Sequence, residues 1–481
     1  MNTFNKKSLY AALAGVSALG VTGAAQAVNV NPDGLGQVLI YPYYTVRDKV
    51  PGAPFGTLLS VVNSTASAKA VKVRFNEGKN SREVLDFNLF LSKKDVWTVA
   101  VLQTATGAGI GTADKSCTVP PVSSNPAALS EFVNYAYLTD PIADTSLDRT
   151  REGYVEIIEM GTITKGSATE IGVTHKAGVP PCTALGDTTV ASSIEAPTGG
   201  LFGGVTLINV LAGEDYTEDA VALDRFRTNG VYDVPGSIKP DLRDVNPPVA
   251  VVFNGNNVYQ STNWFGSNVD TISALFMHEH IYNEFVLDAV TKSGTDWVLT
   301  APTKRYYYSP SNVAGIDEVD FLFQRNMDAN GGCDDVSITL YDREENTATP
   351  NVSFSPPRPG KPNTLCWEAN VLTFNSSQVL GSKNNRNVTT TYSNGWADLL
   401  IPQTSNGRGQ TGSPAHYLPS FTTTITPLVG ASTVTPVTYF GLPIIGFAVQ
   451  SFNNGTLVVG GNLVQSQYGG NFVHKGTRRI Q

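Results

Sequence analysis

The spacing of apolar and polar residues predicts a run of short β-strands in the N-terminal part of the chain. Within 69–76, Val71, Val73 and Phe75 alternate with charged or amide side chains, which is the period of a strand that buries one face. Comparable β-branched or aromatic runs occupy 37–46, 57–63, 87–91 and 96–102. Strands of this length, separated by short polar turns, are typical of a β-sandwich.

Part of this pattern resembles a known fold. An apolar strand is followed by the turn Asn63-Ser64-Thr65, an alternating strand, and the motif Leu-Ser-x-x-Asp-x-Trp that ends at Trp97. This order resembles the immunoglobulin-like sandwiches that are common in exported bacterial proteins. The resemblance covers about residues 28–105. It implies an immunoglobulin-like topology for the N-terminal part and carries no catalytic residues.

The rest of the chain predicts further antiparallel β-sheet with a few short helices. The acidic start of 217–226 favours a short helix. Around 272–285 the apolar residues have the spacing of a helical face: Ile272, Leu275, Phe276, Ile281 and Phe285. Segments 304–308 and 337–341 indicate strands, and Asn453-Asn454-Gly455 indicates a hairpin turn between two apolar runs. The fold class is therefore mainly β.

The first 27 residues have the three parts of a secretory signal peptide. Lys6 and Lys7 form a basic start, and 9–21 is an apolar stretch too short to span a membrane. Ala25-Gln26-Ala27 has the small-x-small pattern that signal peptidase cleaves. We expect cleavage before Val28 and export by the Sec route to the extracellular space, the cell surface or the periplasm.

These observations suggest a division of the chain into four parts. The signal peptide at 1–27 is followed by a β-sandwich domain at 28–118 and a central β-rich domain with short helices at 119–300. A C-terminal β-rich domain then covers 301–481. No transmembrane segment is expected after cleavage.

Four cysteines remain in the mature chain: Cys117, Cys182, Cys333 and Cys366. Several disulfide connectivities are compatible with this number, and we favour sequential pairing, Cys117–Cys182 and Cys333–Cys366. A metal site built from the thiolates is the alternative. The chain has no Cys-x-x-Cys spacing and its expected compartment is oxidising, so structural disulfides are favoured.

Composition adds one point about the surface. Only 15% of the residues are charged and the formal net charge is −8, whereas soluble domains usually carry about 25% charged residues. Uncharged polar groups must therefore cover much of the surface. The acidic balance argues against nucleic-acid binding, which requires a basic face.

The sharpest candidate for chemistry is His278-Glu279-His280 with Glu284. Imidazole and carboxylate groups are usual zinc ligands. On a strand, His278 and His280 would share a face, whereas on a helix they would point apart. The flanking apolar spacing favours the helix, on which His280 and Glu284 form an i,i+4 pair. We therefore favour solvated or hydrogen-bonded histidines over a metal site.

A second candidate is a calcium site in the turn that contains Asp328, Asn330 and Asp334. The loop is not an EF-hand, because Cys333 and Thr339 stand where that motif needs Gly and Glu. The acidic group Glu214, Asp215, Glu218 and Asp219 is a further candidate. A polar turn and an acidic helix start are the favoured interpretations, so no cofactor is expected, and weakly bound Ca²⁺ is the alternative.

Aromatic residues provide a third candidate. If 304–308 is a strand, Tyr306 and Tyr308 share a face and could stack against a sugar, although strand aromatics more often pack in cores. No catalytic residues are predicted. The chain has no Gly-x-Ser-x-Gly motif, and Glu156 and Glu159 fall on opposite faces of a strand, unlike a glycosidase pair.

Over its whole length the chain resembles exported cell-surface proteins of Gram-negative bacteria, some of them S-layer-like. The segments that carry this resemblance are 36–45, 81–97, 199–209, 302–308 and 365–375. It implies a surface location and a structural role. We therefore expect a non-enzymatic secreted or cell-surface protein that acts through protein–protein contacts, by self-association or with other surface components. The alternative is a secreted polysaccharide-binding protein or metal-assisted hydrolase.

Overall fold

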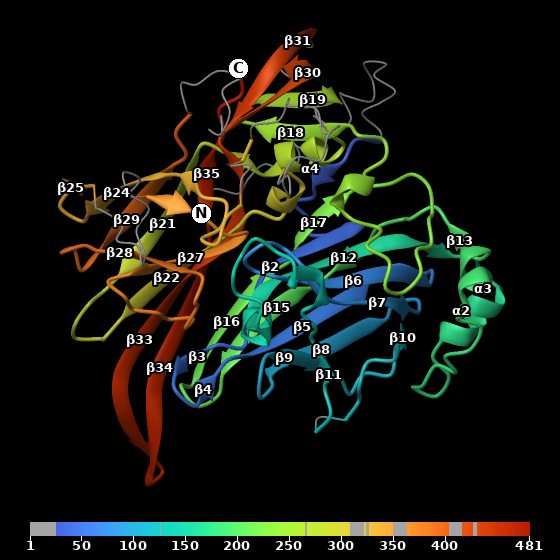
Figure 1. The fold of residues 1–481 in the computed structure, drawn as a ribbon, viewed down its shortest axis with the longest axis horizontal. Coiled ribbons are helices and arrows are strands. Elements are labelled where there is room, and N and C mark those ends of the chain that lie inside the picture. The colour runs from blue at the N-terminus through green and yellow to red at the C-terminus, as the bar shows by residue number, and fades with distance from the viewer. Residues whose placement is uncertain are drawn as a thin grey trace.

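The computed structural model describes residues 26–125, 127–264, 267–307, 322–323, 327–349, 363–403, 416–426 and 431–481. Most of the signal peptide expected at 1–27 therefore lies outside the described residues. The described chain is mainly β, as predicted, with three short α-helices. Figure 1 shows blue and green strands on one side of the molecule and yellow to red strands on the other.

Two antiparallel sheets are built from the N-terminal half of the chain. The strand order of the first sheet is β1 (Asn29–Val30), β17 (Val221–Asp224), β2 (Val38–Thr45), β12 (Glu152–Ile163), β6 (Lys69–Glu77), β7 (Glu83–Leu91) and β10 (Cys117–Val119), with β13 (Ile194–Glu195) beside β12. That of the second sheet is β11 (Ser130–Glu131), β9 (Ala108–Gly111), β8 (Val96–Gln103), β5 (Gly56–Asn63), β15 (Gly204–Asn209) and β16 (Glu214–Asp219), with β14 (Leu201–Phe202) beside β5.

The inward side chains of these two sheets share one hydrophobic core, which makes them a sandwich. Val73 on β6 and Val61 on β5 are fully buried there. Phe87 on β7 packs edge-to-face on Trp97 of β8, with ring centroids 5.6 Å apart. The alternating apolar residues thus form the core that their spacing predicts. Because β12 lies between β2 and β6, this sandwich combines strands from both sides of residue 118.

The segment 214–224 corrects one prediction. It forms the strands β16 and β17 in place of the helix expected at 217–226. Along β16, Glu214 and Tyr216 are buried while Asp215 and Thr217 are exposed, which is strand periodicity. Tyr216 packs against Phe55 with ring centroids 6.3 Å apart. This tertiary contact outweighs the weak helical preference of the acidic residues.

The C-terminal half forms a second sandwich. The third sheet runs β25 (Thr347–Ala348), β24 (Ser337–Asp342), β29 (Asn394–Leu400), β21 (His280–Val286) and β35 (Lys475–Thr477). The fourth runs β28 (Asn385–Val388), β27 (Ala369–Phe374), β22 (Gly294–Thr300), β33 (Ile445–Val459) and β34 (Asn462–Val473). Phe285 of the third sheet stacks on Phe374 of the fourth, with ring centroids 5.2 Å apart.

The fourth sheet is buried on both faces. Trp297 and Leu372 pack in the core shared with the third sheet, whereas Val298 and Val371 belong to the core of the first sandwich. Strands buried on both sides are continuous apolar runs, as 296–300 largely is. The two sandwiches are therefore packed against each other through the fourth sheet.

Smaller elements complete the described chain. The fifth sheet runs β18 (Ala250–Asn254), β19 (Asn257–Trp264), β30 (Tyr417–Thr426) and β31 (Ala431–Phe440). Two-stranded pairs are β3 (Asp48–Val50) with β4 (Ala53–Pro54), β20 (Met277–His278) with β32 (Leu442–Pro443), and β23 (Asp334–Asp335) with β26 (Thr364–Leu365). Short 3-10 helices are η2 (Tyr135–Tyr137), η3 (Leu147–Arg151), η4 (Leu242–Asp244) and η5 (Lys304–Tyr307).

The three α-helices of the described residues are α2 (Ala168–Val173), α3 (Asp187–Ala191) and α4 (Val269–Phe276). The helix predicted around 272–285 is correct only as far as Phe276, because β20 and β21 follow it. Within the part of the chain that the structure describes, none of the helices has the length and apolar character needed to cross a membrane.

Both disulfides have the favoured sequential pairing. Cys117 on β10 is bonded to Cys182, and Cys333 is bonded to Cys366 next to β26. Disulfides of this kind persist in oxidising compartments, so they are consistent with a protein that matures outside the cytoplasm.

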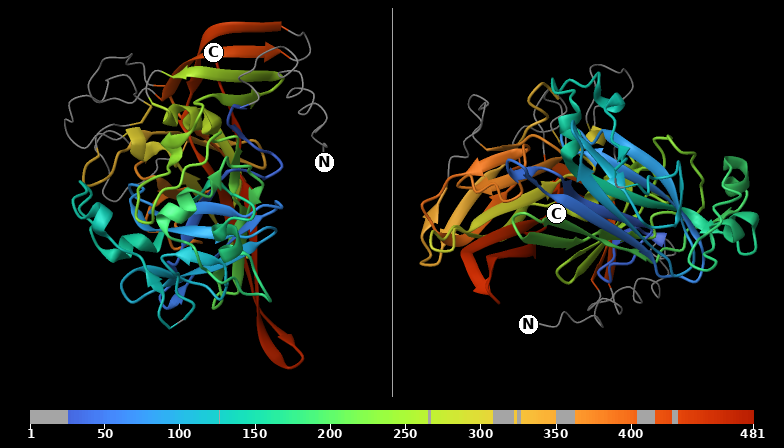
Figure 2. Two further views of the ribbon diagram at one scale, coloured as in Figure 1. Left: turned by 90° about the vertical axis from the view of Figure 1, so that its right-hand side faces the viewer. Right: turned by 90° about the horizontal axis from the view of Figure 1, so that it is seen from below.

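One feature projects from the body. β33 and β34 form a long hairpin whose tip extends beyond the rest of the molecule, seen in red at the bottom of the left view in Figure 2. Its turn lies at 460–461, so the turn predicted at Asn453-Asn454-Gly455 was wrong: these residues lie within β33, where the pairing is irregular. Up to Ser451, β33 also pairs with β22. From Asn453 onward the two strands of the hairpin pair only with each other among the described residues. We call the hairpin from Asn453 to Gln467 the arm.

Candidate functional site

The two histidines of the zinc candidate lie on different short strands. His278 ends β20 and His280 begins β21. His280 Nδ1 lies 2.9 Å from Asp398 Oδ1 on the adjacent strand β29, whereas His278 Nδ1 donates to the carbonyl oxygen of Phe276 at 2.8 Å. Glu284 is exposed on β21. The helical i,i+4 pair of His280 and Glu284 was therefore wrong, because the helix ends before either residue.

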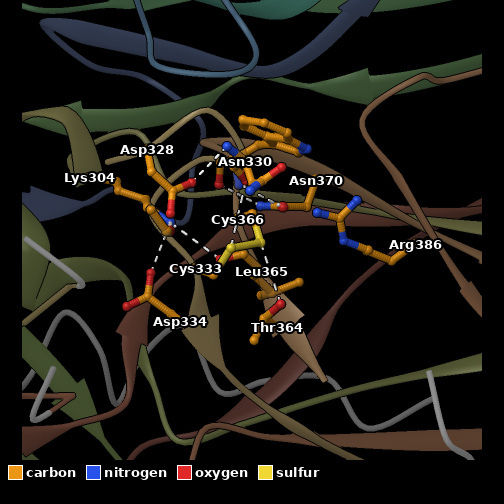
Figure 3. The surroundings of a disulfide bond; sticks show 12 residues. Lys304, Asp328, Asn330, Cys333, Asp334, Thr364, Leu365, Cys366, Asn370 and Arg386 are labelled. Atoms are coloured by element: carbon orange, nitrogen blue, oxygen red, sulfur yellow. Dashed lines mark hydrogen bonds and ion pairs between the residues drawn. A yellow bond between two sulfur atoms is a disulfide. The ribbon is translucent and has the colours of Figure 1, made fainter. Parts of the chain in front are cut away.

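The residues of the calcium candidate have other partners. Asp334 is fully buried; its Oδ2 accepts a hydrogen bond from Lys304 Nζ at 2.8 Å, and its Oδ1 lies 3.4 Å from His416 Nε2. Burial acts to raise the pKa of Asp334, but Lys304 and His416 outweigh it and lower the pKa. Figure 3 shows Asp334 and Lys304 beside the Cys333–Cys366 disulfide.

Asp328 and Asn330 form a tight turn in the same region. Asp328 Oδ1 accepts a hydrogen bond from the backbone N–H of Asn330 at 2.7 Å, as in an Asx-turn. Across the described ranges, no group of three or more His, Cys, Asp or Glu side chains is arranged to hold a metal ion. Zinc and calcium were the disfavoured alternatives at these residues, and a metal-binding measurement tests them.

Tyr306 lies on η5, so the strand predicted over 304–308 is a 3-10 turn where the structure describes it. The guanidinium groups of Arg243 and Arg305 lie 4.9 and 5.1 Å from its ring centroid. Burial raises the pKa of Tyr306. A ring in contact with two guanidinium groups has little free surface for a sugar. Tyr308 lies outside the described residues.

A pocket at the junction of the two sandwiches gathers the most unusual set of titratable groups. It has a volume of about 230 Å³, and we call it the junction pocket. The first sandwich contributes side chains from β1, β2, β16 and β17, and the second from α4, β20, β21 and β33–β35. Its polar side chains are Glu218, His278, His474, Lys475 and Arg478.

Both imidazoles of the junction pocket are held in the neutral form. Burial, reinforced by Arg478, lowers the pKa of His278 to about 3. Burial also lowers the pKa of His474 to about 4. His474 donates from Nε2 to the carbonyl oxygen of Val298 at 2.9 Å and accepts at Nδ1 from the amide of Asn283 at 3.0 Å. These contacts fix its tautomer and orientation.

Burial disfavours the charged forms of two further groups in the pocket, Glu218 and Arg478. Burial raises the pKa of Glu218 to about 7, although Asn471 donates to its carboxylate at 2.5 Å. Burial lowers the pKa of Arg478 to about 10. Arg478 donates to the carbonyl oxygens of Ala274, Leu275 and Met277 at 2.7–3.3 Å, which caps the C-terminal end of α4.

Sequence reasoning singled out His278 and Glu218 but not their neighbours in the pocket. His474, Lys475 and Arg478 are about 200 positions further along the chain, and only the pairing of β35 with β21 brings them to His278. A lone histidine in a polar C-terminal segment gives no signal of that pairing.

The solvent-facing side of the second sheet forms a different kind of site. A shallow groove of about 670 Å³ crosses β5, β8, β15 and β16. Leu58 and Phe202 line it and are 47% and 41% exposed, and threonines line much of the remainder. Among the described residues that line the groove, Asp219 is the only charged one.

The arm contains no charged residue. No Asp, Glu, Lys or Arg occurs between Asn453 and Gln467, and Val458 is 70% exposed. Both of its strands present backbone N–H and C=O groups along edges that pair with no third strand among the described residues. Edges of this kind are able to pair with another chain. Groove and arm are thus the two surfaces of the described chain best suited to protein contacts.

A scan against protein-family models finds no match to this chain, and a search of curated proteins finds none either.

Proposed function

We propose that this chain is a non-enzymatic structural protein of the cell surface or the extracellular space, and that it works by self-association as a subunit of an S-layer or filament. The observation that carries the proposal is the groove of the second sheet, in which Leu58 and Phe202 are exposed to solvent and Asp219 is the only charged residue among the described lining. A sheet face turned to water is normally polar, and contiguous exposed apolar residues mark interaction sites.

The arm supports the same proposal. It offers free strand edges and no charges that would have to lose their water on contact. Arm and groove are different surfaces, so a contact between the arm of one copy and the groove of the next is heterologous. Heterologous contacts that do not close into a ring produce open filaments or lattices.

The proposed location rests on two supports. The sequence of the first 27 residues has the organisation of a Sec signal peptide, and both disulfides are consistent with maturation in an oxidising compartment. Sec export followed by retention at the cell surface is the route we propose. Amino-terminal sequencing of the secreted protein should find Val28 as its first residue.

The proposal is tested by the size of the mature protein in solution. Sedimentation velocity over a wide range of concentration, with and without Ca²⁺, should reveal assemblies that grow with concentration. Leu58→Glu and Phe202→Glu should each shift the distribution to the monomer, because a buried contact would then contain an unpaired carboxylate. Leu138→Glu is the matched control, since Leu138 is exposed outside the groove. A protein that stays monomeric throughout would refute the proposal.

The groove also favours one alternative, a secreted polysaccharide-binding protein. A groove across a sheet with an exposed aromatic ring at Phe202 could accommodate a sugar chain stacked on that ring. Affinity electrophoresis in gels that contain cell-wall polysaccharides distinguishes the two functions. Binding that is lost in Phe202→Ala and retained in Phe421→Ala, another exposed phenylalanine, would favour the alternative.

A further inference from the structure

The junction pocket contains two cationic side chains, Arg478 and Lys475. Neither Arg478 nor Lys475 forms an ion pair within the described ranges of the chain, and the guanidinium of Arg478 has only backbone carbonyl partners. Glu218, the acid of the pocket, is half-protonated near neutral pH because burial raises its pKa to about 7. The pocket is therefore electrostatically suited to an anion.

The remaining walls are apolar. Side chains from both sandwiches form them: Val30, Val221, Leu275, Phe276, Ile281, Ile444 and Val473. The volume of about 230 Å³ exceeds the roughly 150 Å³ of an apolar cavity that holds benzene. It is smaller than the roughly 300–1,000 Å³ that is usual for drug-sized ligands. The space thus fits one ring or a short hydrocarbon chain with a small charged group.

The pocket is preformed by rigid neighbours. His474 is fixed by hydrogen bonds at both ring nitrogens, and its ring lies 5.2 Å from that of Trp297. The ring of His278 packs over Gly476, where a Cβ atom would come within 2.5 Å of it. Preformed walls lower the entropic cost of binding.

We propose that the junction pocket binds a small apolar monocarboxylate. Arg478 and Lys475 compensate the charge of the ligand, and the hydrocarbon part lies among the apolar walls. The site is separate from the groove and the arm, so this inference holds whether or not the protein self-associates.

Benzoate is a suitable probe, with benzyl alcohol as its uncharged analogue, and titration calorimetry on the mature protein measures both affinities. Benzoate should bind more tightly than benzyl alcohol. Val221→Phe fills the pocket and should abolish binding, whereas Val210→Phe places the same ring on an exposed turn and should leave binding unchanged. Lys475→Gln should weaken benzoate binding about fivefold, as expected for the loss of about 1 kcal/mol.

Lys115→Gln removes an exposed lysine that does not line the pocket and is the control for Lys475→Gln. Three results would overturn the inference: no heat of binding from benzoate at millimolar concentration, equal affinity for benzyl alcohol, or equal binding by Val221→Phe and Val210→Phe. Circular dichroism of each variant verifies that it is folded, so a loss of binding can be assigned to the pocket.

Discussion

Glu152 on β12 accepts a hydrogen bond from the hydroxyl of Ser382 at 2.5 Å, and this contact joins the two sandwiches. The same buried carboxylate accepts from Tyr43 at 2.8 Å, from Arg47 Nε at 2.9 Å and from the backbone N–H of Lys383 at 3.0 Å. A buried charge with this many donors is fully compensated. Glu152 therefore fixes the position of the segment around 382 on the first sandwich.

Removal of this carboxylate should be strongly destabilising. In Glu152→Ala, Arg47 would lose its buried partner, and the free energy of unfolding should fall by about 3–5 kcal/mol. Ser382→Ala removes this hydrogen bond and the one that the hydroxyl accepts from the backbone N–H of Asn384, and should cost about 2 kcal/mol. Urea denaturation measures both. Glu131→Ala, at an exposed position, is the control, and a cost for Glu152→Ala no larger than for this control would contradict the assignment.

Glu156 lies on the same strand as Glu152. Its substitution should stabilise the protein above pH 7, whereas substitution of Glu152 should destabilise it. It is fully buried, and neither carboxylate oxygen has a hydrogen-bond partner among the described residues. Burial raises its pKa to about 7, despite Arg74 at 4.0 Å. The unfolded chain loses this proton near pH 4.3, so the contribution of Glu156 to stability should decline as the pH rises from about 4.5 to about 7.

Glu156→Gln removes the ionisable group and should abolish that decline. Above pH 7 the variant should be more stable than the wild type by about 2–3 kcal/mol. Glu159→Gln is the matched control, because Glu159 is equally buried but accepts a hydrogen bond from Lys69 at 2.6 Å. It should destabilise the protein at the same pH. Chemical denaturation at several pH values measures both, and an unchanged pH profile in Glu156→Gln would contradict the prediction.

The two buried imidazoles of the junction pocket should lower the free energy of unfolding at acidic pH. With a pKa of about 3 for His278 and about 4 for His474, the folded protein stays unprotonated at both, whereas unfolded histidine binds a proton below about pH 6.5. The contribution of these two histidines to stability should therefore fall as the pH drops from about 6.5 toward 4. His474→Gln should reduce this fall, and His175→Gln, outside the pocket, should not. Equal acid profiles of the two variants would refute this role for His474.

The strands of the first sandwich could be predicted because apolar side chains occupy every second position on the face that each strand turns to the core. Val71, Val73 and Phe75 predicted a half-buried strand, and β6 occupies 69–77. The structure buries both faces of β6, and Lys72 and Arg74 on its second face form ion pairs with Asp86 and Glu83. The disulfide pairing was also accessible, since the structure pairs cysteines that are neighbours in the sequence. A single sequence is sufficient to predict a feature that depends on the periodicity within one strand or on the pairing of consecutive cysteines.

Other features depend on partners far along the chain. The acidic residues of β16 predict the start of a helix from sequence alone. The contact of Tyr216 with Phe55, which favours the strand, is visible only in the structure. The apolar spacing around His278 and His280 predicts a helix. The structure places them on strands, because β20 pairs with β32 and β21 pairs with β29. The junction pocket needs the C-terminal strand β35 beside β21. Such pairings between distant segments leave no periodic signal in a single sequence.

Gly476 should be essential for the wall of the junction pocket. A Cβ atom there would lie 2.5 Å from the ring of His278 and 2.9 Å from the carbonyl oxygen of His280. Gly476→Ala should therefore destabilise the protein by about 1–3 kcal/mol, the usual cost of overpacking. Gly186→Ala is the control, because nothing lies within 4 Å of its added methyl group. Thermal unfolding compares the two, and equal midpoints would contradict the close packing.

Shortening the arm should separate folding from assembly. Asn453 pairs with Gln467 at its base, so residues 454–466 can be replaced by Asn-Gly, which favours a two-residue hairpin turn. The pairing of β33 with β22 lies before this point, so the thermal midpoint should stay close to that of the wild type. If the free edges of the arm make the contact between copies, sedimentation velocity should find the shortened protein monomeric where the wild type assembles.

A control that replaces only Asn454-Gly455 by Asp-Gly keeps the arm and should assemble normally. Unchanged assembly of the shortened protein would exclude the arm and leave the groove as the contact surface, because no other change was made to the described sheets.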